Sequence, residues 1–348
     1  MKKTLCVILV LAAVFAFAAC GKTETAPVTD DVTVPVTEPA ADTETAPLPE
    51  EDITVKVGVL TGPTGVGAVN MWNNAENADS GIKYAFSAAA APDELVAGIS
   101  KGDVDIAAVA TNLAAKLYKK TNGGIKVLAV NTYGVLSVLT NGETSVTSLA
   151  DLKGKKIVTT GQGANPEYII NYLLTKNGVD PTADVTVEFK TEGADLVPVW
   201  ATEPDAVIIA PAPVSTTILS KYDGAVKALD LTDEWKKVAP DSALMMGCVI
   251  ARTDFIDAHP AVIADFMEKY ASSIEAAGAD PAATGALCEK YGIVPKASIA
   301  EKAMPDFHLC WVTGEEMKNE LSGYLQVLFD ADPSSVGSLP DNGFWYEK

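Results

Sequence analysis

Short hydrophobic runs alternate with segments of helical periodicity along most of residues 53–348. The first run, 53–60, ends at a glycine-rich turn and is followed by apolar residues at helical spacing from Ala68 to Trp72. Further strands and helices are predicted in the same alternating order at 83–88, 92–101, 105–110 and 112–118. This alternation favours a parallel sheet covered by helices on both faces, so we predict an α/β fold.

A second series of the same kind begins near Val135. Its predicted strands cover 136–140, 156–160, 185–189 and 206–209. Ser148 to Asp151 form a capping-box pattern, and a helix is predicted over 166–176 with Asn165 as its N-cap. Because the plan restarts, we predict two lobes with a ligand cleft at the carboxyl ends of their strands. The predicted lobes comprise 53–135 with 246–348 (lobe I) and 136–245 (lobe II).

The C-terminal part is predicted to contain one strand and then helices only. The strand covers 242–251 and leads into a helix over 260–276. A second capping-box pattern, Thr313 to Glu316, precedes a predicted helix over 317–329.

The N-terminus has the pattern of an export signal. Lys2 and Lys3 precede an apolar run that is too short to span a bilayer comfortably, and small residues then lead to Cys20. This end resembles a bacterial lipobox, which implies that 1–19 is a signal peptide and that Cys20 carries a lipid. Ordinary secretory cleavage is the alternative. Residues 20–52 are acidic, rich in Thr and Pro and free of aromatic residues, so we expect a disordered tether and an extracytoplasmic, lipid-anchored protein.

Charge and rare residue types exclude several functions. The chain has 26 Lys and Arg against 46 Asp and Glu, a formal net charge of −20, so we expect no binding to nucleic acid. Arg252 is the one arginine, expected at the hinge or on the far side of a helix start, and the two histidines are His259 and His308. We therefore expect no histidine-rich metal site, no multi-arginine clamp and no cofactor. Cys288 and Cys310 can be buried thiols or a disulfide, because spacing does not decide between them.

The turns that follow the predicted strands carry the candidate ligand-binding residues. Glycines at two helix starts leave backbone N–H groups free, which favours a negative or strongly polar ligand group. Prolines after the strand at 206–209 would supply apolar walls. The full predicted set is Thr61, Pro63, Thr64, Gly65, Val66, Gly67, Thr111, Asn112, Gly161, Gln162, Gly163, Ala164, Asn165, Pro211 and Pro213.

Each of these predictions has a structural alternative. The glycine turns can be tight turns without a ligand, and Asn112 and Gln162 can simply cap local backbone. Aromatic residues that could stack on a planar ligand, or could belong to the core instead, are Trp72, Tyr133, Tyr168 and Trp200.

Several sequence blocks, in order along 53–348, resemble the extracytoplasmic solute-binding proteins of ABC transporters in the nitrate/sulfonate/taurine and thiamine-pyrimidine-precursor group. The blocks cover 60–65, 102–113, 148–157, 161–166 and 252–260. The resemblance implies a type II periplasmic-binding-protein architecture, with a two-strand hinge and a central cleft. Relatives often have a Pro-Glu-Pro turn where this chain has Ala210-Pro211-Ala212-Pro213, so the acidic contact of that turn is missing.

The resemblance also implies the partners. They are a small polar, aromatic or anionic ligand, an ABC permease with its ATPase, and the membrane through the N-terminal lipid; we expect a monomer. A tethered sensor that presents its closed form to a membrane receptor is the alternative function. An enzyme on the same fold is disfavoured, because neither histidine is accompanied by a Gly-x-Ser-x-Gly or similar nucleophile motif.

Overall fold

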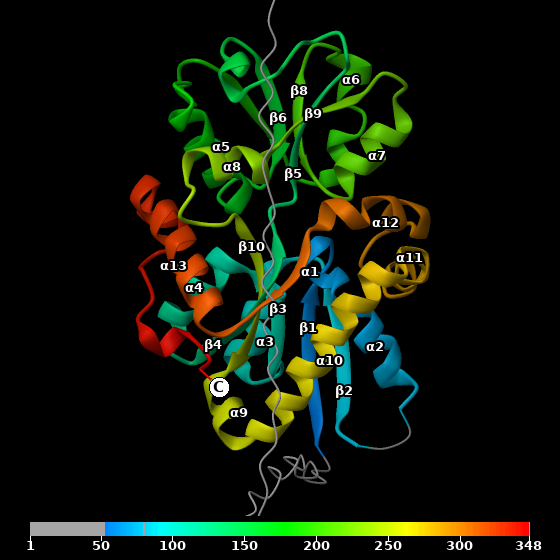
Figure 1. Ribbon diagram of the computed structural model, residues 1–348, viewed down its shortest axis with the longest axis vertical. Helices are drawn as coiled ribbons and strands as arrows, with labels where there is room; N and C mark the ends of the chain where they lie inside the picture. The colour runs from blue at the N-terminus through cyan, green and yellow to red at the C-terminus, as the bar shows by residue number, and fades with distance from the viewer. Residues whose placement is uncertain (1–52, 79–80, 348) are drawn as a thin grey trace, which may run out of the picture. The chain divides into compact units, whose positions relative to one another are not determined.

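The computed structural model describes residues 53–78 and 81–347. The predicted signal peptide, Cys20 and the tether lie outside these residues, so the predictions made for them stay predictions. The described residues contain two β-sheets, which Figure 1 shows one above the other. None of the helices in this part of the chain combines the length and the apolar composition needed to cross a membrane.

The first sheet has six strands in the order β11-β4-β10-β3-β1-β2. Strand β1 pairs in parallel with β2 and β3, whereas β10 runs antiparallel between β3 and β4, and β11 runs antiparallel to β4. The strands are β1 (Thr54–Leu60), β2 (Lys83–Ala89), β3 (Ile106–Ala110), β4 (Ile125–Tyr133), β10 (Met245–Arg252) and β11 (Leu309–Val312).

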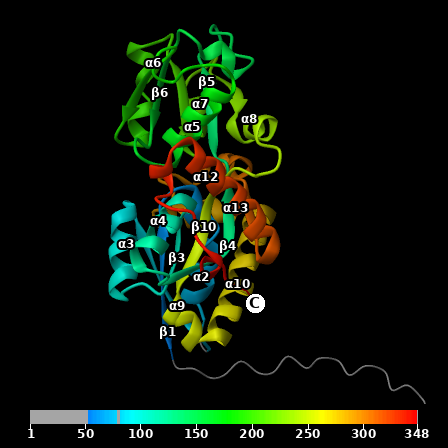
Figure 2. The same cartoon turned by 90° about the vertical axis from the view of Figure 1, so that its left-hand side faces the viewer.

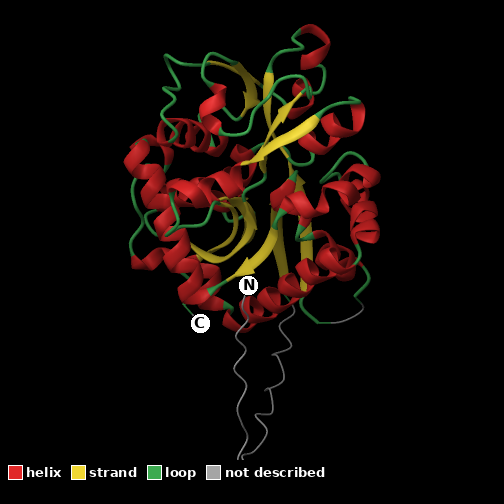
Figure 3. Cartoon of the chain, turned by 45° about the horizontal axis from the view of Figure 1, so that its top comes forward, coloured by secondary structure: helices red, strands yellow, loops and turns green. Residues whose placement is uncertain are grey.

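Helices cover both faces of this sheet because its strands are apolar on both sides (Figure 3). On β3, Ala107 and Val109 belong to one hydrophobic cluster and Ile106 and Ala108 to another, as the two-residue period of a strand requires. The helices are α1 (Pro63–Val66), α2 (Val69–Glu76), α3 (Pro92–Lys101), α4 (Thr111–Thr121), α9 (Thr253–Ala258), α10 (Pro260–Ala279), α11 (Pro281–Lys290), α12 (Ala297–Ala303) and α13 (Gly314–Ala331). Short 3-10 turns follow at η3 (Met304–Phe307), η4 (Pro333–Ser335) and η5 (Asn342–Phe344).

The second sheet has five strands in the order β7-β6-β8-β5-β9. Strand β6 pairs in parallel with β7 and β8, and β5 is antiparallel to β8 and β9. The strands are β5 (Leu136–Thr140), β6 (Lys156–Thr160), β7 (Thr186–Lys190), β8 (Val207–Pro211) and β9 (Val226–Asp230). Their helices and 3-10 turns are η1 (Leu149–Leu152), α5 (Asn165–Lys176), η2 (Gly193–Leu196), α6 (Val199–Thr202), α7 (Val214–Lys221) and α8 (Leu231–Val238).

The chain passes between the sheets twice, from β4 to β5 and from α8 back to β10. Gly134 lies on the first passage, and its carbonyl accepts a hydrogen bond of 3.1 Å from Thr232 Oγ1 and contacts Nδ1 of His308. A Cβ on Gly134 would lie 2.4 Å from Thr232 Oγ1 and 2.5 Å from Leu244, so only glycine fits this crossing without displacement. The two crossings fit the two-lobe architecture with a hinge.

Helix α13 connects the two sheets through packing as well. It contacts β4 and β10 of the first sheet and α5 of the second, and Figure 2 shows it at the level where the sheets meet. Trp235 of α8 lies 5.0 Å from Tyr172 and 5.3 Å from Tyr324 of α13, measured between ring centroids. One hydrophobic cluster therefore runs through both sheets, and the lobe boundaries at 135 and 245 stay a prediction.

Some local predictions were wrong. The segment after the long helix is not wholly helical, because Leu309–Val312 forms β11. Thr313 does not cap α13 with its side chain, and the N-cap of α5 is Ala164 in place of Asn165. The capping box of Ser148 and Asp151 is confirmed, although it opens a 3-10 turn.

Cysteine pairing is also settled for the described part of the chain. Cys248, Cys288 and Cys310 are free thiols, so the disulfide alternative is wrong. Burial raises the pKa of the Cys288 thiol to about 12.

Candidate functional site

A cavity of about 350 Å³ is lined by residues from both sheets and their helices. The parallel strands β1, β3, β6 and β8 end near it, as ligand sites of open α/β sheets require. Its lining consists of Pro63, Thr64, Pro92, Ala110, Asn112, Leu113, Lys116, Thr132, Val135, Gly163, Ala164, Asn165, Pro166, Pro211 and Met246.

The structure brings part of the predicted site together at this cavity. Those residues are Pro63, Thr64, Asn112, Gly163, Ala164, Asn165 and Pro211. The other predicted residues are absent from its lining, namely Thr61, Gly65, Val66, Gly67, Thr111, Gly161, Gln162 and Pro213.

Several residues of this second group do not line the cavity but stabilise the segments that do. Thr111 is fully buried, and its Oγ1 donates a hydrogen bond of 2.7 Å to the carbonyl of Met245, which joins the start of α4 to the start of β10. A Cβ on Gly65 would lie 2.3 Å from the carbonyl of Leu60, so glycine is required for the tight turn after β1. Gln162 is exposed.

The turn that carries Pro63 and Thr64 is fixed by a buried amide that the sequence did not reveal. Nδ2 of Asn131, on β4, donates hydrogen bonds of 3.0 Å to the carbonyl of Thr64 and to the hydroxyl of Tyr270. Burial raises the pKa of Tyr270, more than the bond from Asn131 lowers it, so the hydroxyl stays neutral at physiological pH. Asn131 thus ties the wall of the cavity to the core of the first sheet.

The turn before α5 satisfies part of its own hydrogen-bonding capacity. The N–H of Gly163 donates a bond of 2.6 Å to Oε2 of Glu167, in the first turn of the same helix. The N–H of Ala164 donates one of 3.1 Å to the carbonyl of Gly161. On the other lobe, the N–H of Gly65 is likewise bonded to the carbonyl of Gly62, at 3.1 Å. Because these N–H groups are already bonded within the chain, fewer of them are free to bind a ligand than the glycine pattern predicts.

Helix α4 contributes Asn112 and Lys116 to the cavity from one face. Nδ2 of Asn112 donates a bond of 3.2 Å to the carbonyl of Ser335, so this amide also holds the C-terminal segment. Nζ of Lys116 lies 5.6 Å from the centroid of the Tyr168 ring, on α5. Among the described residues of the lining, Lys116 is the one with a charged side chain.

Asn165, the first residue of α5, has an unusual environment. It is 3% exposed, and neither Oδ1 nor Nδ2 has a hydrogen-bond partner among the described residues. A buried amide without partners costs free energy, and in native proteins such a group needs an explanation. A ligand with a complementary donor and acceptor would provide one.

The aromatic candidates lie elsewhere. Trp72 stacks on Phe86 and Tyr291, with ring centroids 5.4 Å and 4.3 Å away. Nε1 of Trp200 donates a bond of 2.7 Å to the carbonyl of Ala206 inside the second sheet's core. Tyr133 and Tyr168 are not in the lining either, so its described residues present no aromatic ring.

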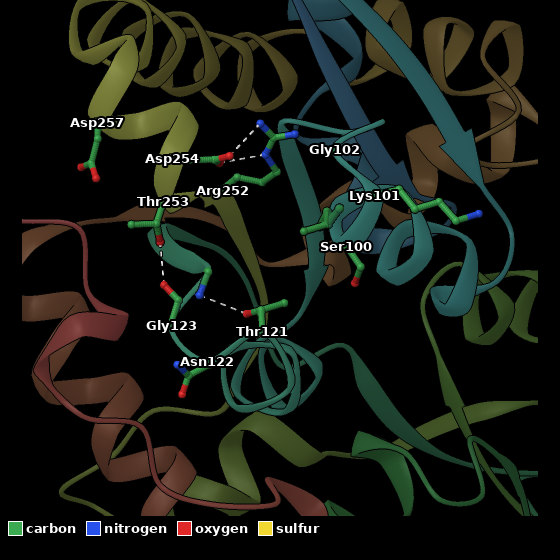
Figure 4. A pocket seen from close by; sticks show the side chains of 12 residues that line it. Ser100, Lys101, Gly102, Thr121, Asn122, Gly123, Arg252, Thr253, Asp254 and Asp257 are labelled. Atoms are coloured by element: carbon green, nitrogen blue, oxygen red, sulfur yellow. Dashed lines mark hydrogen bonds and ion pairs between the residues drawn. The ribbon is translucent and has the colours of Figure 1, made fainter.

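Arg252 lies at a different cavity, of about 620 Å³ (Figure 4). Residue pairing along β10 places Arg252 at the end opposite to Met245, and its guanidinium forms ion pairs with Asp254 (3.0 Å) and Asp105 (3.7 Å). Arg252 is therefore not part of the lining of the 350 Å³ cavity.

The sequence did not reveal several lining residues. Lys116 follows Asn112 by one helical turn, so the α4 periodicity could have indicated it. Thr132 and Met246 meet at the cavity only because β4 and β10 pair, which no local pattern shows. The described residues hold no cluster of three or more His, Cys, Asp or Glu side chains that could bind a metal ion.

Comparison with known families gives one match. The family model described as NMT1/THI5 like matches residues 78–284. A search of curated proteins finds no matching sequence.

Solved structures with the same fold are numerous. An ABC transporter protein from Parabacteroides distasonis superposes with a TM-score of 0.72 at 22% identity, over 85% of this chain and 100% of that one. The periplasmic aliphatic sulphonate binding protein SsuA from Escherichia coli gives 0.68 at 15% identity, over 84% and 92%. The Candida albicans CA3427 product, which has the generic periplasmic binding protein fold, gives 0.58 at 15%, over 85% and 96%.

Proposed function

Because this chain belongs to the NMT1/THI5-like family, we propose that it is a solute-binding protein of an ABC importer. It captures a small molecule in the 350 Å³ cavity between its sheets and delivers it to a membrane permease. The observation that supports this proposal most directly is the cavity, which is lined by residues from both sheets at the ends of their parallel strands.

The lining suits recognition better than catalysis. Its walls are mostly apolar, from four prolines (Pro63, Pro92, Pro166 and Pro211) and from aliphatic side chains such as Leu113 and Met246. The polar side chains among its described residues carry hydroxyls, amides and one ammonium, with no His, Cys, Asp or Glu among them. A few polar groups in an apolar cavity fix the orientation of a small ligand.

The neighbours support the transport role. The Escherichia coli relative is described as a periplasmic sulphonate binding protein and the Parabacteroides distasonis one as an ABC transporter. By analogy, the permease and its ATPase are the protein partners of this chain, and it acts as a monomer outside the cytoplasm. No cofactor is required for such a role.

The lipid anchor is part of the same proposal. The lipobox-like residues before Cys20 support a lipid on that cysteine, with 20–52 as a tether. Radioactive palmitate should label the wild-type protein in cells and leave Cys20→Ser unlabelled. Equal labelling of both would contradict the anchor but would not affect the cavity.

Thermal unfolding of the purified full-length chain tests the binding function. A set of sulfonates, nitrate, amides, pyrimidines and flavins is screened, and a true ligand at a hundred times its Kd should stabilise the fold by about 2.7 kcal/mol. Ala164→Trp, which fills the cavity, should abolish the shift. Ala183→Trp, at an exposed position outside the cavity, should keep it. Stabilisation that survives Ala164→Trp would place binding elsewhere.

A further inference from the structure

The turn before α5 already binds a negatively charged group, the side chain of Glu167. The carboxylate of Glu167 accepts the N–H of Gly163 at 2.6 Å. Helix N-termini attract anions through such N–H groups and through the helix dipole. A ligand sulfonate or carboxylate at this turn would meet Glu167 at close range, and like charges repel.

Compensating positive charge is scarce. Lys116 supplies the one ammonium among the described lining residues, and it lies over the ring of Tyr168. Lys116 and Glu167 together bring a formal charge of zero to the cavity and its rim. Arg252 is occupied at the other cavity, where it pairs with Asp254 (Figure 4) and also with Asp105. The electrostatics of the cavity therefore favour an uncharged ligand.

Asn165 defines the pattern of hydrogen bonds that such a ligand must supply. Its carboxamide offers one acceptor, Oδ1, and one donor group, Nδ2, side by side, and both lack partners among the described residues. Both atoms are shielded from solvent in this structure, so a ligand reaches them only when the residues packed around Asn165 move aside. Bonds formed at this buried position would be stronger than bonds exposed to water.

We infer that the ligand is an uncharged molecule with a hydrogen-bond donor beside an acceptor, as in a primary or cyclic amide, and that Asn165 recognises this edge. The inference rests on the proposed function. The described lining has no aromatic ring, so the apolar part of the ligand would pack against Leu113, Met246 and the prolines. This specificity differs from that of the sulphonate-binding neighbour in Escherichia coli.

A matched set of probes tests the inference on the full-length chain. Benzamide, benzoate and benzenesulfonate share one apolar body, and a wider set of uncharged amides, cyclic amides and small anions is measured beside them. Affinity is taken from calorimetry. Uncharged compounds with adjacent donor and acceptor should bind best, and Asn165→Leu should weaken that binding by at least about tenfold, the effect of losing buried hydrogen bonds.

Two further variants separate recognition from general damage. Asn171→Leu makes the same change on the same helix, outside the cavity, and should keep wild-type affinity. Glu167→Gln removes the carboxylate and should shift the preference several-fold toward benzoate. Tightest binding by anions, or amide binding that survives Asn165→Leu, would overturn the inference and leave the proposed function intact. Binding by no compound of any class would count against both.

Discussion

Replacing Asn165 by leucine should make the ligand-free protein more stable. Leucine has the same branched skeleton of heavy atoms as asparagine but no polar atoms that need partners. In the wild type, Oδ1 and Nδ2 are buried without a hydrogen bond among the described residues, and Asn165 is 3% exposed. The substitution removes this penalty and adds apolar burial. A residue that lowers the stability of the ligand-free protein is typical of a binding site.

The size of the effect follows from these features. Leaving a buried amide unsatisfied costs about 1–3 kcal/mol. Unfolding of roughly 300 ordered residues at about 2.1 cal/mol/K each has an entropy near 0.6 kcal/mol/K at the melting temperature. Asn165→Leu should therefore raise Tm by about 2–5 °C.

Differential scanning calorimetry of the ligand-free full-length chain measures this change. Asn171→Leu is the matched control on α5, and its Tm should change by less than about 1 °C, because Asn171 is only partly buried. A fall in Tm for Asn165→Leu would refute the reasoning, because it would show that the carboxamide already has partners that stabilise the fold. An equal rise in both variants would assign the effect to helix propensity.

Three other predictions concern stability and titration. Thr111→Val removes the buried donor of the Met245 carbonyl and should lower the free energy of unfolding in urea by about 1–3 kcal/mol, whereas an unchanged midpoint would show that the bond is dispensable. Hydrogen bonds from Lys156 and Lys190 lower the pKa of Glu188 to about 2. The stabilisation by these pairs is therefore present above about pH 4 and lost as the pH falls toward 2. In Lys156→Met, an NMR titration should show a higher pKa for Glu188 than in the wild type. Alkylation at pH 8 should spare Cys288 until the chain is unfolded, and mass spectrometry of the native protein checks this.

Local patterns predicted those parts of the fold that depend on neighbours in sequence. The strand at 156–160 was predicted to the residue, because an apolar run there lies between lysines and a glycine turn. The helix at 92–101 was predicted equally well, from Pro92 with its acidic first turn to Gly102 in the left-handed conformation. Strand β11 was missed because its four residues are defined by irregular pairing with β4, far away in sequence.

The same distinction applies to the candidate site. Pro63, Asn112 and Pro211 were expected at one cleft and do line one cavity, because each follows or ends a strand whose carboxyl end faces it. That the carboxamide of Asn165 has no hydrogen-bond partner in the described part of the chain could not be predicted, since the sequence suggested that Asn165 caps its own helix. The bond from Gly163 to Glu167 spans only four residues, yet glycine patterns alone indicated a free anion-binding turn.

The position of β10 has a consequence for the order in which the molecule assembles. Every strand of the second sheet lies within 136–230, so that sheet can form as soon as this stretch is available. In the first sheet, β10 separates β3 from β4, and it is made long after both. Closing such a long loop is slow, so we expect the first sheet to be completed last. A chain halted before Met245 would hold a complete five-stranded sheet beside another with a gap at its centre.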